Sequence, residues 1–264
     1  VAVAARRKEK RKREDATARP TRSANTHHQV PQHHVSSMAV HPLTEENSVE
    51  WLKQASNQPI IVLDWDDTLL PNTHLSMLGF SDESATFTLS EEKAAELKLL
   101  ENEIGSFLRA CLKTGECHIV TNGMQGWVER SCERFFPSIV PLLSSFTITS
   151  ARSKFEKRFP KSPVEWKIAA FTEVLGEDSS PERSASGGAM PLQVLAIGDS
   201  EHDRQAIQYV AGRASDVQLM SVKFVENPSI SQLQKQLSLM GGFLTQLFAH
   251  GEALDLVLSP NMLR

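Results

Sequence analysis

The sequence has few cysteines and no long apolar run, and each absence argues against a class of protein. Cys111, Cys117 and Cys132 are odd in number and lack the spacing of a metal site, which argues against a disulfide-stapled secreted fold or a zinc module. We interpret them as buried thiols of an intracellular protein. No stretch approaches 18 consecutive apolar residues, so we predict no membrane span. The N-terminal residues lack the apolar region of a secretory signal, and the chain begins with Val, as a fragment or processed product would.

The near-neutral net charge of −4 conceals two unlike parts of the chain. Residues 1–22 hold nine basic and three acidic side chains, whereas the rest holds 19 of the 28 basic and 29 of the 32 acidic ones. The basic run from Arg6 to Arg13 has two open interpretations: a nuclear-import signal or anchor for anionic partners, and a solvated tail without a partner. The expected location is therefore cytoplasmic or nuclear. The acidic remainder makes nucleic acid an unsuitable substrate for a site there, although the basic run could bind it.

The composition divides the chain into a tail and one globular domain. Residues 1–47 are rich in Ser, Thr, Pro, Gln and His, and they hold too little apolar surface to offset the entropy of ordering. We predict disorder for residues 1–47 and interpret the histidine pairs there as low-complexity sequence rather than a metal site. Hydrophobic residues are 40% of the chain, enough for one core in a domain over 48–264. Residues 177–190, rich in Ser and Gly, are predicted to be a flexible surface insertion.

Hydrophobic periodicity predicts strands that alternate with helices. Short apolar runs indicate strands at 59–63, 117–120, 146–149, 192–197 and 217–225. Helical spacing indicates helices at 90–113, 124–134, 162–175, 202–213 and 229–249, with residues 70–90 as loop and 229–264 as a helical extension. Ser162 and Glu165 form a sequence pattern for a capping box, with Pro163 at the first helical position. This alternation predicts an α/β fold with a Rossmann-like, doubly wound parallel sheet.

Polar side chains follow three of the predicted strands, where the working site of a parallel sheet lies. The first strand is followed by Asp64-Trp65-Asp66-Asp67-Thr68, the second by Thr121-Asn122, and the fourth by Gly198-Asp199 with Asp203 four residues on. Carboxylates at one edge repel each other unless a cation intervenes, and hard oxygen ligands suit Mg²⁺. One carboxylate could then attack phosphorus and a second could act as general acid and base. Thr121 and a lysine could bind the equatorial phosphoryl oxygens.

These motifs, in this order, resemble those of the haloacid dehalogenase-like (HAD) superfamily over about residues 58–225. Its first motif, a hydrophobic strand with Asp-x-Asp-x-Thr, is matched by Ile60 to Thr68, and its second by the strand ending in Thr121. Its lysine is best matched by Lys167, although Lys154, Lys157 and Lys161 lie close by. Its last motif, a strand ending in Gly-Asp with a second Asp four residues later, is matched by Asp199 and Asp203. Asp67 stands where many members have Gly.

The resemblance implies a role for each matched residue. Asp64 would be the nucleophile and a Mg²⁺ ligand. Asp66 would be the general acid and base, and its backbone carbonyl would also bind the metal. Thr68 would order the turn after the strand, and Thr121 and Lys167 would hold the phosphoryl group. Thr68 and Asn122 are also expected to contact the substrate. Asp199 and Asp203 would complete the metal site.

The resemblance predicts a Mg²⁺-dependent phosphatase that forms an aspartyl-phosphate. The stretches that carry the family's cap domains are short here, so we expect no large cap and a site that is open or covered only by residues 70–90. The expected substrate is a phosphomonoester, either a small molecule or a phosphoprotein. The alternative from another class is a catalytically weak HAD-like module that recognises phosphorylated or anionic partners. The oligomeric state is not predicted.

Overall fold

A computed structural model describes residues 58–82, 86–176, 191–214 and 216–263. The predictions for the tail (1–47) and for the insertion (177–190) lie outside these residues. Among the described residues, no helix combines the length and the apolar character that crossing a bilayer requires.

The described residues form an α/β fold around a six-stranded sheet, as the sequence predicts. The strands lie in the order β3-β2-β1-β4-β5-β6, and each neighbouring pair is parallel. Their bounds are β1 Ile60–Leu63, β2 Glu116–Thr121, β3 Thr147–Ser150, β4 Leu192–Gly198, β5 Val217–Lys223 and β6 Leu254–Val257. The central strands β1 and β4 are buried along their whole length, which explains their continuous apolar sequence. The carboxyl ends of β1, β2 and β4 therefore meet at one edge.

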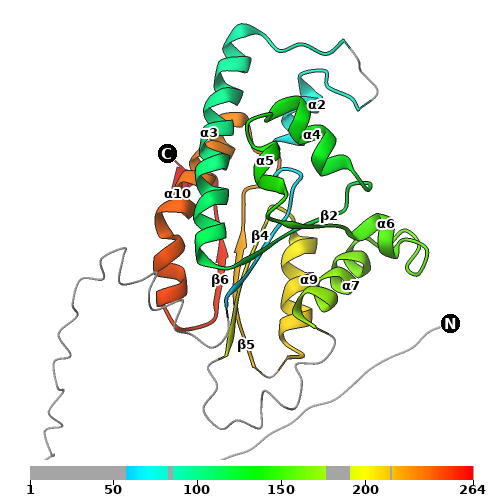
Figure 1. Cartoon of the computed structure of the whole chain (residues 1–264), viewed down its shortest axis with the longest axis vertical. Coiled ribbons are helices and arrows are strands. Elements are labelled where there is room, and N and C mark those ends of the chain that lie inside the picture. The colour runs from blue at the N-terminus through cyan, green and yellow to red at the C-terminus, as the bar shows by residue number, and fades with distance from the viewer. Residues whose placement is uncertain (1–57, 83–85, 177–190, 215, 264) are drawn as a thin grey trace, which may run out of the picture. The chain divides into compact units, whose positions relative to one another are not determined.

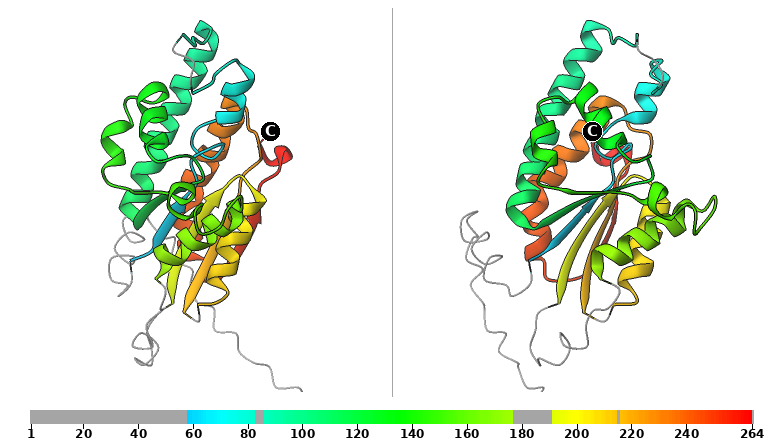
Figure 2. Two further views of the ribbon diagram at one scale, coloured as in Figure 1. Left: turned by 90° about the vertical axis from the view of Figure 1, so that its right-hand side faces the viewer. Right: turned by 45° about the vertical axis from the view of Figure 1, so that its right-hand side comes forward.

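Helices cover both faces of this sheet (Figure 1). Their bounds are α2 Asn72–Met77, α3 Glu91–Thr114, α4 Trp127–Phe135, α5 Val140–Leu143, α6 Ala151–Phe155, α7 Pro163–Leu175, α9 Glu201–Ala211 and α10 Ile230–Ala249, with a 3₁₀ turn η1 at Pro260–Leu263. Helices α3 and α10 pack together on one face, whereas α7 and α9 pack together on the other (Figure 2). Successive β1 side chains alternate between two cores: Ile61 and Leu63 lie with α3 and α10, and Ile60 and Val62 with α7 and α9.

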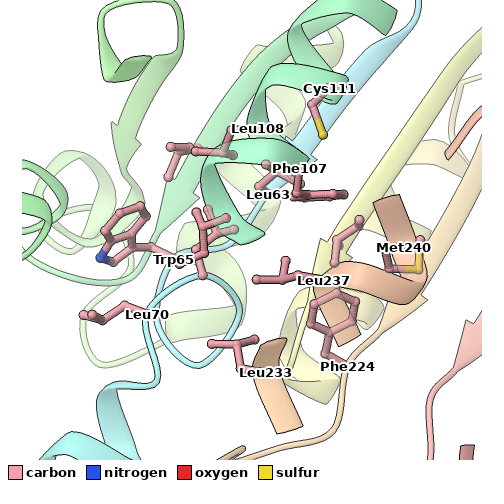
Figure 3. Close-up of a cluster of buried hydrophobic side chains, with 14 of the residues drawn as sticks. Leu63, Trp65, Leu70, Phe107, Leu108, Cys111, Phe224, Leu233, Leu237 and Met240 are labelled. Carbon is pink, nitrogen blue, oxygen red and sulfur yellow. The ribbon is translucent and has the colours of Figure 1, made fainter. Parts of the chain in front are cut away.

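The core on the α3–α10 face is the larger of the two. Figure 3 shows Leu63 of β1 among Phe107 of α3 and Leu237 and Met240 of α10. Trp65, two residues beyond β1, is fully buried in the same core, and its indole Nε1 donates to Ser131 Oγ of α4 at 2.9 Å. The packing therefore anchors the chain on both sides of Asp64.

Three predictions about local structure are wrong. The predicted loop 70–90 contains the short helix α2, and the predicted helical extension 229–264 contains β6 and η1 as well as α10. Ser162 makes no capping hydrogen bond to α7, although Pro163 does open that helix. The capping box lies instead at the start of α10, where Ser229 and Gln232 each bond the other's backbone N–H.

Candidate active site

The three predicted strand ends are neighbours in the sheet. Residues Leu63 of β1 and Ile197 of β4 pair in register, and Leu63 also pairs with Ile119 of β2. The Asp64 N–H donates to Ile197 O at 2.9 Å, which continues the β1–β4 ladder by one residue. This register places Asp64 between Thr121 at the end of β2 and Asp199 after β4.

Lys167 is the lysine that reaches the strand ends. It projects from α7, is only 1% exposed, and its Nζ lies 2.6 Å from Asp64 Oδ1 and 2.8 Å from Asp203 Oδ1. The same Nζ donates to Val120 O at 2.6 Å. Burial alone would lower the pKa of Lys167, but the charges of Asp203 and Asp64 outweigh burial and raise it. The lysine is therefore held as a cation between two carboxylates.

Asp64, Asp199 and Asp203 form an acidic triad. One carboxylate oxygen from each lies within 4.8 Å of the others. Burial raises the pKa of Asp64; Lys167 opposes this change, and the negative charges of Asp203 and Asp199 add to it. Burial and the charge of Asp203 raise the pKa of Asp199 to about 7. One lysine does not balance three acids, so this set of oxygen donors fits a divalent cation such as Mg²⁺.

Asp203 is held in the triad by its place in α9. Ser200, the residue that caps α9, accepts from the Asp203 N–H at 3.2 Å and donates its hydroxyl to Asp203 Oδ2 at 2.6 Å. Gly198 makes this approach possible, because a Cβ there would lie 2.8 Å from the Asp203 Cβ. The spacing of four residues between Asp199 and Asp203 is thus the turn from β4 into α9.

Asp66 makes its hydrogen bonds with residues other than Lys167. Its Oδ2 accepts from Thr121 Oγ1 at 3.2 Å, and its Oδ1 accepts from the Trp127 indole Nε1 at 2.9 Å. Burial raises the pKa of the Asp66 carboxyl, although both hydrogen bonds act to lower it. Trp127 was not among the residues predicted for the site. Its role depends on the packing of α4 against the residues that follow β1, a contact between distant segments that no local sequence pattern encodes.

Asp67 and Thr68 shape the turn after Asp66 and are not members of the triad, although the negative charge of Asp67 also raises the pKa of Asp199. Asp67 adopts a left-handed conformation with φ of 54°, which explains why glycine also suits this position. Its carboxylate accepts from the Thr73 N–H at 2.9 Å and from the Thr73 hydroxyl. Thr68 is fully buried, and within the described part of the chain its Oγ1 has no hydrogen-bond partner. The structure therefore places Thr68 under the turn rather than at a surface that a substrate could touch.

An open cleft of about 480 Å³ lies beside Asp66. The loop after β2 and helix α4 form one wall, and α2 with the residues after it forms the other. The lining residues are Asp66, Asn72, Ser76, Phe80, Ser81, Asp82, Asn122, Gly123, Met124, Trp127 and Arg130. The predicted Asn122 thus borders the cleft, and its Nδ2 makes a long contact of 3.5 Å with Pro163 O. This volume is in the range of clefts that bind small molecules.

No family model, curated protein or solved structure matches this chain. The assignment to the HAD superfamily therefore stays a prediction from the motifs.

Proposed function

We propose that this protein is a Mg²⁺-dependent phosphohydrolase of the HAD type that acts on a phosphomonoester through an aspartyl-phosphate. The observation that carries the proposal is that two carboxylates only two residues apart in the sequence have different surroundings. Asp64 lies in the triad and contacts Lys167, whereas Asp66 contacts Thr121 and Trp127 and borders the cleft. A buried ion pair that served only stability would have no use for Asp199 or for Asp66 at the cleft.

The acidic triad is suited to Mg²⁺. Asp64, Asp199 and Asp203 would hold the ion, and the resemblance adds the Asp66 backbone carbonyl. Mg²⁺ bound there would neutralise charge and orient a phosphoryl group. Lys167 is already a cation at this place, so it would contribute to binding the phosphoryl oxygens.

The two carboxylates would perform the two halves of the reaction. An Asp64 oxygen attacks the phosphorus, and the bond from phosphorus to the alcohol oxygen breaks as Asp66 gives that oxygen a proton. The raised pKa of Asp66 favours the protonated form that this step needs. Asp66 then takes a proton from water, the water oxygen attacks phosphorus, and the bond to Asp64 breaks to release phosphate. Thr121 and Trp127 hold the Asp66 carboxylate in both steps.

Hydrolysis of phenyl phosphate with Mg²⁺ tests the proposal. We expect Asp64→Asn to abolish phosphate release, because the amide cannot attack phosphorus, and EDTA to abolish it in the wild-type protein. Asp255→Asn is the matched control, since this partly exposed carboxylate of β6 pairs with Arg204 of α9 and lies outside the site. Full activity of Asp64→Asn would refute the proposal.

One observation favours the alternative of a binding module. The Lys167 ammonium lies 2.6 Å from the Asp64 oxygen, and a carboxylate held this closely by a buried cation is a weakened nucleophile. Such a module would bind phenyl phosphate in the presence of Mg²⁺ without releasing phosphate. Calorimetric titration of the wild-type protein, run beside the activity assay, separates the two functions.

A further inference from the structure

The cleft beside Asp66 presents a cation and an apolar surface in one small volume. Among its lining residues, Arg130 is the only one with a cationic side chain. Trp127 and Phe80 contribute aromatic rings, with centroids 6.4 Å apart and planes 21° from parallel, and Met124 is half exposed. A ring or short carbon chain would find apolar contacts along this wall.

The Arg130 guanidinium retains capacity for a further anion. Its side chain is 53% exposed, and its ion pair with Asp82 has an Nη2–Oδ2 distance of 3.6 Å, longer than a hydrogen bond. Its bond to Gln125 O is also long, at 3.4 Å. A carboxylate or phosphate could engage the planar guanidinium through two shorter bonds, which neither contact does now.

The backbone around Gly126 holds Arg130 at the cleft. Gly126 has a φ of +78° and precedes α4, and a Cβ at this position would lie 2.9 Å from Arg130 Nη1. The guanidinium therefore lies over a residue that has no side chain. The positive end of the α4 dipole is at the same wall, because Gly123, Met124 and Trp127 line the cleft.

Helix geometry relates Arg130 to the reacting end of the cleft. Trp127 contacts Asp66 directly, and Arg130 follows it by three residues, one turn along the same face of α4. The rise between their Cα atoms is about 4.5 Å, and the Arg130 guanidinium reaches back from there to Gly126, which precedes Trp127. A substrate whose phosphoryl group lies between Asp64 and Asp66 would extend along Trp127 and reach Arg130 with its far end.

We propose that the cleft binds the alcohol part of a small phosphomonoester that carries a second anionic group, and that Arg130 recognises this group. This inference rests on the proposed phosphohydrolase function and adds the substrate class to it. The recognised chemistry is an oxyanion, either a carboxylate or a second phosphate, a few bonds beyond the ester oxygen. Arg130 is then a specificity-determining residue and has no part in the bond-breaking steps.

Two aryl esters of the same shape test this assignment. We compare 4-carboxyphenyl phosphate with 4-carbamoylphenyl phosphate, which replaces the carboxylate by a neutral amide, and measure kcat/KM for wild-type protein and Arg130→Gln. For each ester, the kcat/KM of the wild-type protein is divided by that of the variant, so the intrinsic reactivity of the ester cancels. We expect Arg130→Gln to lower kcat/KM about fivefold to tenfold for the carboxylate ester and less than twofold for the amide ester.

Arg109→Gln is the matched control, because Arg109 is an exposed arginine of α3 outside the cleft lining. It removes the same charge and is expected to change kcat/KM for the two esters by the same factor. A phosphorylated serine peptide is assayed in the same way. If the peptide is hydrolysed much faster than the carboxylate ester, and Arg130→Gln does not change its rate of hydrolysis, the small-molecule assignment is overturned.

The outcomes for this inference and for the proposed function are distinct. Equal loss for both esters in Arg130→Gln, while Asp64→Asn abolishes hydrolysis of both, would overturn the role of Arg130 and leave the phosphohydrolase intact. Wild-type protein that hydrolyses neither ester with Mg²⁺ would contradict the proposed function and this inference with it. Circular dichroism of each variant confirms that folding is unchanged.

Discussion

Lys167 is the residue on which the electrostatics of the site depend. It is buried and contacts Asp64, Asp203 and the Val120 carbonyl, so every donor of its ammonium group has an acceptor nearby. The two carboxylates have in turn little access to water. A buried cation between two buried acids is costly to remove, because its loss leaves uncompensated charge in a poorly solvated place.

We therefore predict that Lys167→Met destabilises the metal-free protein by about 3–5 kcal/mol, since Asp64 and Asp203 are then left without their cation. Mg²⁺ should restore part of this loss, because a divalent ion can supply the missing charge, while phosphate release stays abolished. Urea unfolding with and without Mg²⁺ measures both effects. Lys157→Met, which alters an exposed lysine nearby, is the control. An unchanged midpoint for Lys167→Met in EDTA would show that the ion pair contributes nothing to stability.

At the scale of elements, α3 supports the site from a distance through Glu101. This carboxylate is buried at 2% exposure, and its Oε1 accepts from the Ser138 N–H at 2.8 Å and from the Ser138 hydroxyl at 2.6 Å. Burial alone would raise the pKa of Glu101, but the hydrogen bonds from Lys98 and Ser138 outweigh it and lower the pKa. Glu101 thus ties α3 to the segment between α4 and α5. It lies outside every motif, so the sequence analysis does not single it out.

We predict that Glu101→Ala lowers the free energy of unfolding by about 1–3 kcal/mol, because the hydrogen bonds that Ser138 and Lys98 donate to this buried carboxylate are lost. The adjacent Asn102→Ala removes an exposed side chain from the same helix and should change stability by less than about 0.5 kcal/mol. Thermal and urea unfolding at neutral pH measure the difference between the two variants. Equal stability of Glu101→Ala and Asn102→Ala would mean that Glu101 does not tie the two segments together.

For the molecule as a whole, the sheet joins two cores that do not share side chains. Leu237 of α10 lies in the core with α3, and Phe171 of α7 lies in the core on the opposite face. Among the described residues, the two cores meet at strands such as β1, whose successive residues belong to one core and then to the other. The site lies where these strands end, so loss of either core should also disrupt the arrangement of the site residues.

We predict that Leu237→Ala and Phe171→Ala each lower the free energy of unfolding by about 2–5 kcal/mol, through loss of buried contacts and creation of a cavity. Unfolding should stay a single transition in both variants, because the shared strands cannot keep their structure with one face uncovered. Far-ultraviolet circular dichroism and tryptophan fluorescence, followed in urea, should give coincident curves. Phe243→Ala alters a half-exposed residue of α10 and serves as the control. Separate transitions would show that the cores unfold independently.

Much of the site could be predicted from sequence because its residues lie at the ends of apolar strands. Asp64, Thr121 and Asp199 follow such runs, and parallel strands bring their carboxyl ends together whatever the helices do. Lys167 could be singled out only through the family motif, because Lys154, Lys157 and Lys161 lie close by in the sequence. In the fold, Lys167 reaches the site because α7 packs across β2 and this packing buries one face of the helix.

The sequence by itself determined the strand–helix alternation and the clustering of acids, since both depend on short-range patterns of apolar and charged residues. The tertiary structure alone decided that Trp127 would hold Asp66, that Arg130 would enter the cleft, and that Leu254–Val257 would add a sixth strand. Each of these depends on contacts between segments far apart in the chain. Such contacts follow from how whole helices and strands pack, and no local pattern encodes them.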